Sequence, residues 1–342
     1  MAIFINLIVA LCFYSTLVSA QDKATISVGT ASGIGTAATM IALEKGYYRE
    51  LGLDVRIEQS KSSVDIMLLV ANGTLQIVEG GINAGYFNAV ARGMPIKIIS
   101  DRVSTPVESK ILIRADLKDE IKSVKDLKGR RVGNNGAGSI GTYEIGKVLE
   151  AHGLKYGDLD IKILGFPEIA ITFTNKSIDA ALVIQPWATQ MIEEGLAVNI
   201  ANVDDHVTTF TKSVIYMNTE WAARNPLVAA RYFSATQRAV REYCQAYHKG
   251  SNRQEVIDIL VKTGMETRRD IINNYPWPSR NINGIVNEQS VMDIQDFYVR
   301  NGIINQRLTY QQLVSTSYIQ HSIENQSKFE LENKDSKLKG CR

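Results

Sequence analysis

The sequence predicts an α/β protein built as two units and followed by a helical region. Strand and helix patterns alternate from Ile26 to Glu194, which is typical of strands joined by covering helices. The alternation restarts after Ser109, and from Asn225 onward the pattern is helical only. A length of 342 residues also suits two lobes better than one core. We therefore expect parallel sheets with helices on both faces.

The first unit is a βαβ series. Short apolar or alternating runs predict its strands, and capped stretches that end at a glycine predict its helices. The expected strands are Ile26–Gly29, Leu53–Ile57, Leu75–Val78 and Ile96–Ser100. The expected helices are Thr36–Lys45, Ser63–Asn72 and Asn83–Arg92.

The second unit repeats the pattern after Ser109. Its expected strands are Lys110–Arg114, Arg131–Gly133, Ile161–Leu164 and Ala180–Ile184. Its expected helices are Ser139–His152, Pro167–Thr174 and Pro186–Glu194. The chain thus has a second α/β unit of its own.

The region after Asn225 is helical. Asn225 and Pro226 take N-cap and first-turn positions, and apolar residues then recur every three or four residues as far as Tyr247. Further helices are expected at Ser251–Lys262, Asn287–Arg300 and Thr309–Gln320. The polar, charge-mixed tail of residues 327–342 is expected to be disordered.

A glycine-rich loop follows the strand at Arg131–Gly133. Residues 134–138 carry no bulky side chain, and Ser139 then opens a helix. Free backbone amides and the positive end of the helix dipole favour a carboxylate, sulfonate or phosphate at such a place. Glycine-rich strand-to-helix turns also occur without any ligand, so the loop alone leaves both interpretations open.

The first twenty residues are interpreted as an export signal. Residues 1–20 carry no charge, and an apolar run from Ile3 to Val18 is followed by Val18-Ser19-Ala20, a small-residue cleavage pattern. We expect cleavage after Ala20 and a periplasmic location. The run is almost long enough to remain as an uncleaved anchor, and that alternative stays open.

Composition excludes several partner classes. The formal net charge is +2 without a block of like charges, so nothing indicates binding to nucleic acid. After Ala20 no apolar stretch approaches the length of a membrane span. Cys244 and Cys341 remain after cleavage; they could pair in an oxidising compartment, or they are two unrelated thiols.

A series of short motifs occurs in a fixed order. They are Ala42–Tyr48, Leu51–Val55, Ala71–Leu75, Ala91–Lys97, Val124–Gly133, Gly138-Ser139, His152–Leu154 and Ile178–Trp187. Together they resemble the nitrate/sulfonate/taurine-type solute-binding proteins of ABC importers over roughly residues 24–220. That family also includes proteins that bind thiamine-precursor pyrimidines and a related pyrimidine synthase that consumes its own histidine.

The resemblance implies a bilobal periplasmic-binding-protein fold of type II, with the ligand between the lobes and a two-segment hinge. Lobe 1 would comprise residues 21–109 and 215–326, and lobe 2 residues 110–214. The chain would cross near Glu108–Ile111 and return near Ser213–Tyr216. The resemblance implies a monomer that captures a small molecule by closure and delivers it to an ABC permease and ATPase, without a cofactor, a metal or catalysis.

The resemblance also implies ligand contacts at the carboxyl ends of strands, where α/β sheets bind their ligands. The turn after the first strand and the turn after Leu75–Val78 would supply contacts from the first unit. The Ser139 helix and the Pro-Trp turn would supply them from the second. The expected binding residues are Thr30, Ser32, Gly33, Glu79, Gly80, Gly81, Gly138, Ser139, Gln185, Trp187 and Tyr216.

Departures from the family pattern bear on the ligand. Gln76 and Gln185 stand where the family often has Asp, and Glu79 replaces a position that is more often aromatic or neutral. A carboxylate facing the cleft would repel nitrate. It would suit a taurine-like zwitterion with its acidic end at Ser139, or an aminopyrimidine stacked on Trp187 or Tyr216. A simple sulfonate stays a third candidate.

Two rival functions are weaker. The histidines at 152, 206, 248 and 321 are scattered, none lies in a metal-binding spacing, and no nucleophile–histidine set can be placed. The cysteine cluster expected of the pyrimidine synthase is missing from the sequence. A two-lobed sensor domain is the other alternative, and a neighbouring kinase gene in place of permease and ATPase genes would favour it.

Overall fold

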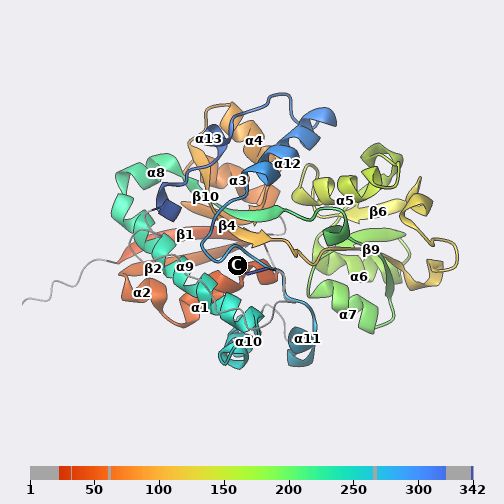
Figure 1. Cartoon of the computed structure of the whole chain (residues 1–342), viewed down its shortest axis with the longest axis horizontal. Helices are drawn as coiled ribbons and strands as arrows, with labels where there is room; N and C mark the ends of the chain where they lie inside the picture. Colours follow the sequence, from red (N-terminus) through yellow and green to blue (C-terminus); the bar gives the residue numbers. More distant parts are fainter. Residues whose placement is uncertain (1–22, 32, 61–62, 265–267, 321–339, 342) are drawn as a thin grey trace, which may run out of the picture.

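The computed structural model describes residues 23–31, 33–60, 63–264, 268–320 and 340–341. Two five-stranded sheets lie side by side, each covered by helices (Figure 1). We call the first sheet with its helices lobe 1 and the second sheet with its helices lobe 2. The predicted leader, Met1 to Ala20, lies outside the described residues. Within the described part of the chain, no helix is long and apolar enough to cross a membrane.

Lobe 1 is built on a sheet in the order β2-β1-β3-β10-β4. Its strands are β1 (Ala24–Ala31), β2 (Leu53–Ser60), β3 (Ile77–Gly81), β4 (Ile96–Ser104) and β10 (Thr211–Asn218). β1 pairs in parallel with β2 and β3, whereas β10 runs antiparallel to both β3 and β4.

Lobe 2 is built on a sheet in the order β7-β6-β8-β5-β9. Its strands are β5 (Lys110–Arg114), β6 (Arg131–Asn134), β7 (Asp160–Ile163), β8 (Ala180–Val183) and β9 (Ala197–Asn202). β6 pairs in parallel with β7 and β8, whereas β5 runs antiparallel to β8 and β9.

The prediction of purely parallel sheets is therefore wrong for β5 and β10. Each of these strands is the first after the chain crosses from one sheet to the other. The neighbouring parallel strands end at the edge that faces the other lobe. A strand that follows a crossing enters the sheet at that same edge, so it runs antiparallel to its neighbours. β9 and β10 were not predicted as strands.

The helices agree with the predicted pattern over most of the chain. Lobe 2 carries α5 (Ile140–Glu150), α6 (Phe166–Thr174) and α7 (Trp187–Glu193). Between the lobe 1 strands lie α1 (Ala37–Glu44), α2 (Tyr47–Glu50), α3 (Ser63–Ala71) and α4 (Ala84–Ala91). The C-terminal region adds α8 (Thr219–Arg224), α9 (Pro226–Tyr247), α10 (Arg253–Lys262), α11 (Arg269–Asn274), α12 (Glu288–Arg300) and α13 (Tyr310–Leu313).

One predicted helix is interrupted. A single helix was expected over Thr309–Gln320, but α13 ends at Leu313. Val314 forms a bridge with Ile98 of β4, and the Ser315 amide donates to the Ile98 carbonyl at 2.8 Å. Pairing with the sheet edge competes with the helix and ends it.

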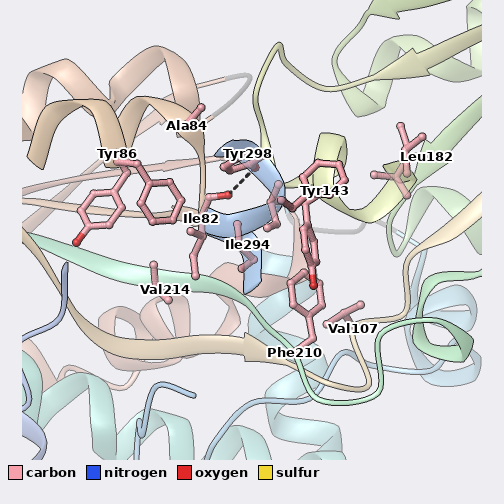
Figure 2. Packing of buried hydrophobic residues seen from close by; sticks show 14 of the residues in the cluster. Ile82, Ala84, Tyr86, Val107, Tyr143, Leu182, Phe210, Val214, Ile294 and Tyr298 are labelled. Atoms are coloured by element: carbon pink, nitrogen blue, oxygen red, sulfur yellow. Dashed lines mark hydrogen bonds between the residues drawn. The ribbon is translucent and has the colours of Figure 1, made fainter. Parts of the chain in front are cut away.

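The hydrophobic core continues from lobe 1 into lobe 2. One cluster of buried side chains includes Ile82, Val214 and Tyr298 of lobe 1 together with Tyr143 and Leu182 of lobe 2 (Figure 2). The link is α12, whose Phe297 and Tyr298 lie against α5. The C-terminal region therefore contacts both lobes.

Hydrogen bonds hold α12 against α5. The Tyr298 hydroxyl donates to the Ser139 carbonyl at 2.7 Å. It also lies 3.3 Å from the carbonyl of Ile82, which Figure 2 shows beside it. The Tyr143 hydroxyl donates to Asp293 at 2.6 Å. A methyl group on Gly146 would overlap with the Phe297 ring, so the two helices approach closely at that glycine.

Two short segments carry the chain between the lobes, residues 105–109 and 203–210. The return crossing was expected at Ser213–Tyr216, but these residues pair within the lobe 1 sheet. The predicted lobe boundary at 214/215 therefore divides β10. The two crossings touch, because the Asp204 carboxylate accepts from the Val107 amide at 2.8 Å and the Glu108 amide at 2.9 Å.

A disulfide anchors the end of the chain. Cys244 of α9 is bonded to Cys341 with a Cα–Cα distance of 5.3 Å, so the thiols that the sequence left open are paired. The Cys341 amide donates to the Ser279 hydroxyl at 2.7 Å, and the Ser279 amide donates to the Pro106 carbonyl at 2.7 Å. Of the predicted disordered tail, residues 327–339 and 342 lie outside the described residues. Cys341 itself is buried.

Loss of the disulfide should lower the free energy of unfolding. The bond closes a span of 97 residues, and removing it frees that span in the unfolded chain. We expect Cys341→Ser to cost about 2–5 kcal/mol in a urea titration. Wild-type protein under reductant is the matched control and should give the same loss. Equal stability of oxidised wild type and variant would contradict the prediction.

Candidate functional site

A pocket lies where the two lobes meet, and it encloses about 720 Å³, including space open to solvent. Lobe 1 and the first crossing supply one wall, and the start of α5 with the β8–α7 turn supplies most of the other. Much of the lining is apolar, with a few buried polar side chains among it. The lining residues are Ala31, Gly33, Ile34, Gly35, Gly80, Gly81, Arg102, Val103, Val107, Asn135, Ser139, Ile140, Glu144, Phe166, Ile184, Gln185, Lys212, Ser213 and Pro278.

The wall forms mainly at the carboxyl ends of strands β1, β3, β6 and β8. This is the edge at which α/β sheets bind ligands. Small residues let the two walls approach. A methyl group on Gly81 would overlap with Ile140, and one on Gly33 would lie 3.3 Å from Ile184. Lobe 1 and lobe 2 are thus in contact around the pocket.

The Ser139 end of α5 forms part of the lobe 2 wall. Ser139 is the N-cap residue, and its hydroxyl donates to Asn135 at 3.0 Å. Gly138 has a φ of 64°, which suits the tight turn before the cap, and a side chain there would press on Ala84. The first amides of a helix have no partner within it, so they remain available to an acceptor atom.

A buried ion pair crosses the pocket wall from lobe to lobe. The Lys212 ammonium of β10 lies 2.8 Å from a Glu144 oxygen of α5. Lys212 also donates to the Ser109 hydroxyl in the first crossing. The Glu144 side chain is 1% exposed and that of Lys212 11%. Burial raises the pKa of Glu144, and the adjacent Lys212 opposes the rise.

Arg102 is the second buried cation of the wall. Its guanidinium donates to the Ser213 hydroxyl at 2.8 Å and to the Thr30 hydroxyl at 3.4 Å. Its Nε lies 3.3 Å from a Glu79 oxygen. Burial lowers the pKa of Arg102, and Glu79 opposes this shift. Each of these two buried cations therefore has one carboxylate beside it, Glu79 for Arg102 and Glu144 for Lys212.

Glu79 does not lie on the wall, contrary to the expectation that it would face a ligand. β3 runs on to Gly81, so Glu79 is within a buried strand and not in the turn after it. It is 1% exposed, and one of its oxygens accepts from Thr39 at 2.7 Å and from Tyr232 at 3.0 Å. In this structure Glu79 pairs with Arg102 and accepts hydrogen bonds from Thr39 and Tyr232 inside lobe 1.

The structure brings together Gly33, Gly80, Gly81, Ser139 and Gln185 on the wall, as the sequence suggested. The other expected residues lie behind it. Three of them, Thr30, Tyr216 and Trp187, support wall residues, Gly138 lies against Ala84, and Ser32 is outside the described residues. Thr30 accepts from Arg102, Tyr216 donates to the Gly81 carbonyl at 2.9 Å, Trp187 stacks on Phe166 with ring centroids 5.7 Å apart, and Gly138 contacts Ala84.

Sequence reasoning missed Arg102, Glu144, Phe166 and Lys212. Glu144 had a detectable signal, because it is the one charged residue between Arg131 and Lys147. Lys212 is the one charged residue of β10, whereas Arg102 follows Asp101 in β4. Such charges indicate either an edge position or a buried pair, and only the fold shows which.

Among the described residues, no group of three metal-ligating side chains lies close enough to hold an ion. The described histidines also lie away from the pocket wall; His152 and His206 face each other with ring centroids 5.3 Å apart. The wall instead offers amide, hydroxyl, carboxylate and guanidinium groups around an apolar space. That arrangement can hold a small organic molecule by hydrogen bonds.

Comparison with known proteins identifies the family. A family model described as NMT1/THI5 like matches residues 35–249. This chain belongs to the NMT1/THI5-like family. A Brucella abortus (strain 2308) protein named as a candidate binding protein is 26% identical over 269 residues, covering 76% of this chain and 77% of the relative.

Other relatives differ in what they do. The 4-amino-5-hydroxymethyl-2-methylpyrimidine phosphate synthase THI11 of Saccharomyces cerevisiae is 26% identical over 160 residues, 46% of this chain and 44% of its own. The alkanesulfonate-binding protein SsuA of Xanthomonas axonopodis pv. citri, solved with MOPS, has a TM-score of 0.71 at 18% identity and covers 86% of this chain and 98% of its own.

The periplasmic nitrate-binding protein NrtA of Synechocystis PCC 6803 also has a TM-score of 0.71, at 14% identity, with 88% of both chains covered. At these identities the structures establish a shared fold. The predicted bilobal periplasmic-binding-protein fold and the resemblance to the solute-binding family are confirmed. Both structural relatives are binding proteins.

Breaking the interlobe ion pair should destabilise the protein. Lys212→Met leaves the Glu144 carboxylate buried without a cation, which we expect to cost about 3–5 kcal/mol. Lys262→Met is the matched control, because Lys262 pairs with Glu44 at the surface and such pairs contribute roughly 0–1 kcal/mol. Urea titrations of both variants check this. Equal small losses would show that the buried pair is not needed for stability.

Glu108 in the first crossing should make stability depend on pH. Burial and the neighbouring Asp204 raise the pKa of Glu108 to about 7 from an ordinary value of 4.5. The native state therefore holds this proton more tightly than the unfolded chain. The resulting stabilisation is complete below the unfolded pKa and is lost as the pH rises to about 7.

Glu108→Gln mimics the protonated form at every pH. We expect it to be more stable than wild type by about 1–3 kcal/mol near pH 8, with a smaller difference near pH 5. Urea titrations at both pH values measure this. A difference that does not change with pH would contradict the assignment of the raised pKa to Glu108.

Proposed function

We propose that this protein is the extracytoplasmic substrate-binding component of an ABC importer and captures a small organic ligand by closing two lobes around it. The observation that carries the proposal is the interlobe pocket, whose walls come from both lobes and meet at Gly81 and Ile140. The family and the shared fold with SsuA and NrtA support the proposal.

The proposal assigns the binding contacts to the pocket wall. Gly33, Gly80, Gly81, Ser139 and Gln185 would contact the ligand, together with Arg102, Glu144 and Lys212. Thr30, Gly138, Trp187 and Tyr216 would shape the wall from behind. The ligand classes under consideration are a sulfonate, a taurine-like zwitterion and an aminopyrimidine.

The location and partners follow from this role. The protein would be exported, with its signal peptide cleaved after Ala20, and would act in the periplasm as a monomer. It would deliver its ligand to a permease and ATPase complex. The yeast synthases are the enzyme alternative, but their similarity covers less than half of this chain, and no described histidine lines the pocket.

Closure predicts that Gly81→Ala weakens ligand binding. The added methyl overlaps with Ile140 across the pocket, so the lobes cannot approach as closely. We expect at least a tenfold loss of affinity, about 1.4 kcal/mol, by isothermal titration calorimetry with a ligand found by thermal-shift screening. Small-angle scattering should also show a larger radius of gyration for the ligand-saturated variant than for saturated wild type.

Gly157→Ala is the matched control. Gly157 is exposed in lobe 2, and a methyl group there meets no atom within 4 Å. Wild-type affinity and compaction in Gly81→Ala would show that the Gly81–Ile140 contact is not part of the closed state. A protein that binds no small molecule in any form would refute the proposed function itself.

A further inference from the structure

Two buried polar groups of the pocket wall have no partner in the described part of the chain. They are the second carboxylate oxygen of Glu144, Oε2, and the amide nitrogen of Gln185, Nε2. Glu144 is 0% exposed and Gln185 2% exposed, and both line the pocket. A buried polar group without a hydrogen bond costs free energy, so these groups point to a missing partner.

The partner on the Glu144 side must donate a hydrogen bond. Glu144 Oε1 lies 2.8 Å from Lys212. Burial raises the pKa of this carboxylate, and Lys212 and the nearby Ser109 hydroxyl lower it. Oε2 nevertheless makes no hydrogen bond of normal geometry within the described residues. The other carboxylate near the wall, Glu79, is engaged by Thr39, Tyr232 and Arg102. Glu144 is therefore the one acidic residue among the described lining residues. A carboxylate oxygen accepts most strongly from an N–H group that carries positive charge.

The partner on the Gln185 side must accept a hydrogen bond. The side-chain amide oxygen of Gln185 accepts from the backbone amide of Thr189 in α7 at 3.2 Å. The Nε2 atom of Gln185 therefore points away from α7. Ser139 and the first amides of α5 line the same pocket and offer further donors. An anionic or carbonyl oxygen, or a ring nitrogen, would satisfy this group.

Building on the proposed function, we propose that the ligand carries an amino group bound by Glu144 and a hydrogen-bond acceptor bound by Gln185. Glu144 is then the residue that determines specificity for the amino group. This class includes amino sulfonates, amino carboxylates and aminopyrimidines. Nitrate and unsubstituted alkanesulfonates have no donor for Glu144, so the pocket should bind them poorly.

Matched pairs of probes test the assignment. The pairs are taurine with ethanesulfonate, β-alanine with propionate, and 4-amino-2-methylpyrimidine with 2-methylpyrimidine. Each pair differs in the amino group, so general effects on folding cancel within a pair. In wild-type protein we expect calorimetry to give the amino member of the best pair an affinity about 10- to 100-fold higher, the range of one charge-assisted hydrogen bond.

Two variants separate the roles. Glu144→Gln should remove most of that preference, because it weakens the amino member and spares or improves its partner. Gln185→Met should weaken both members by a similar factor, because the acceptor is common to both, and so should preserve the preference. Loss of affinity by equal factors for both members in Glu144→Gln would overturn the role of Glu144 and would show a structural effect only.

The wild-type data alone also decide the ligand class. If ethanesulfonate, propionate, 2-methylpyrimidine or nitrate binds as tightly as every amino probe, the inference is wrong while the proposed function stands. If no amino probe binds at about 1 mM but native mass spectrometry of protein from its own cells detects a bound molecule without an amino group, the same conclusion holds. If neither experiment detects any bound molecule, both the inference and the proposed function are wrong.

Discussion

The buried ion pair between Lys212 and Glu144 joins the two lobes and the first crossing at the pocket wall. Lys212 is on β10, the strand that enters lobe 1 after the return crossing, and Glu144 is on α5, the helix that follows the glycine-rich loop in lobe 2. Lys212 also donates to Ser109, which lies in the first crossing. Both charges are removed from water, so each depends on the other. The same contact therefore fixes the distance between the lobes at this point and the charges on the pocket wall.

The lobes are joined by more than the two crossings. α12 belongs to the C-terminal region, yet Tyr298 donates to the Ser139 carbonyl at the pocket wall and Phe297 packs on Gly146. Any opening of the lobes must either slide α12 along α5 or carry it with lobe 2. Close packing makes such an interface resist gradual deformation. The proposed closing motion would therefore have to move α12 relative to one of the two lobes.

The sequence by itself determined the fold class and most of its elements. Capping residues such as Asn83 and Asn287, glycines after helices, and alternating strands are local signals, and the structure shows the helices close to the predicted positions. The Ser139 helix was also predicted correctly, because the glycine-rich loop and the cap are contiguous in the chain. The wall residues Gly33, Gly80, Gly81 and Gln185 came from the family resemblance, which implied contacts at the ends of strands.

Tertiary structure alone decided direction, pairing and charge placement. The antiparallel entry of β5 and β10, the early end of α13 at Val314 and the Cys244–Cys341 bond depend on segments far apart in sequence. The carboxylate of the wall shows the same limit. β3 extends to Gly81 and not to Val78 as predicted, so Glu79 lies in the buried strand. Packing of α5 against lobe 1 places Glu144 beside Lys212. Burial and partner identity are properties of the assembled fold, and no local pattern encodes them.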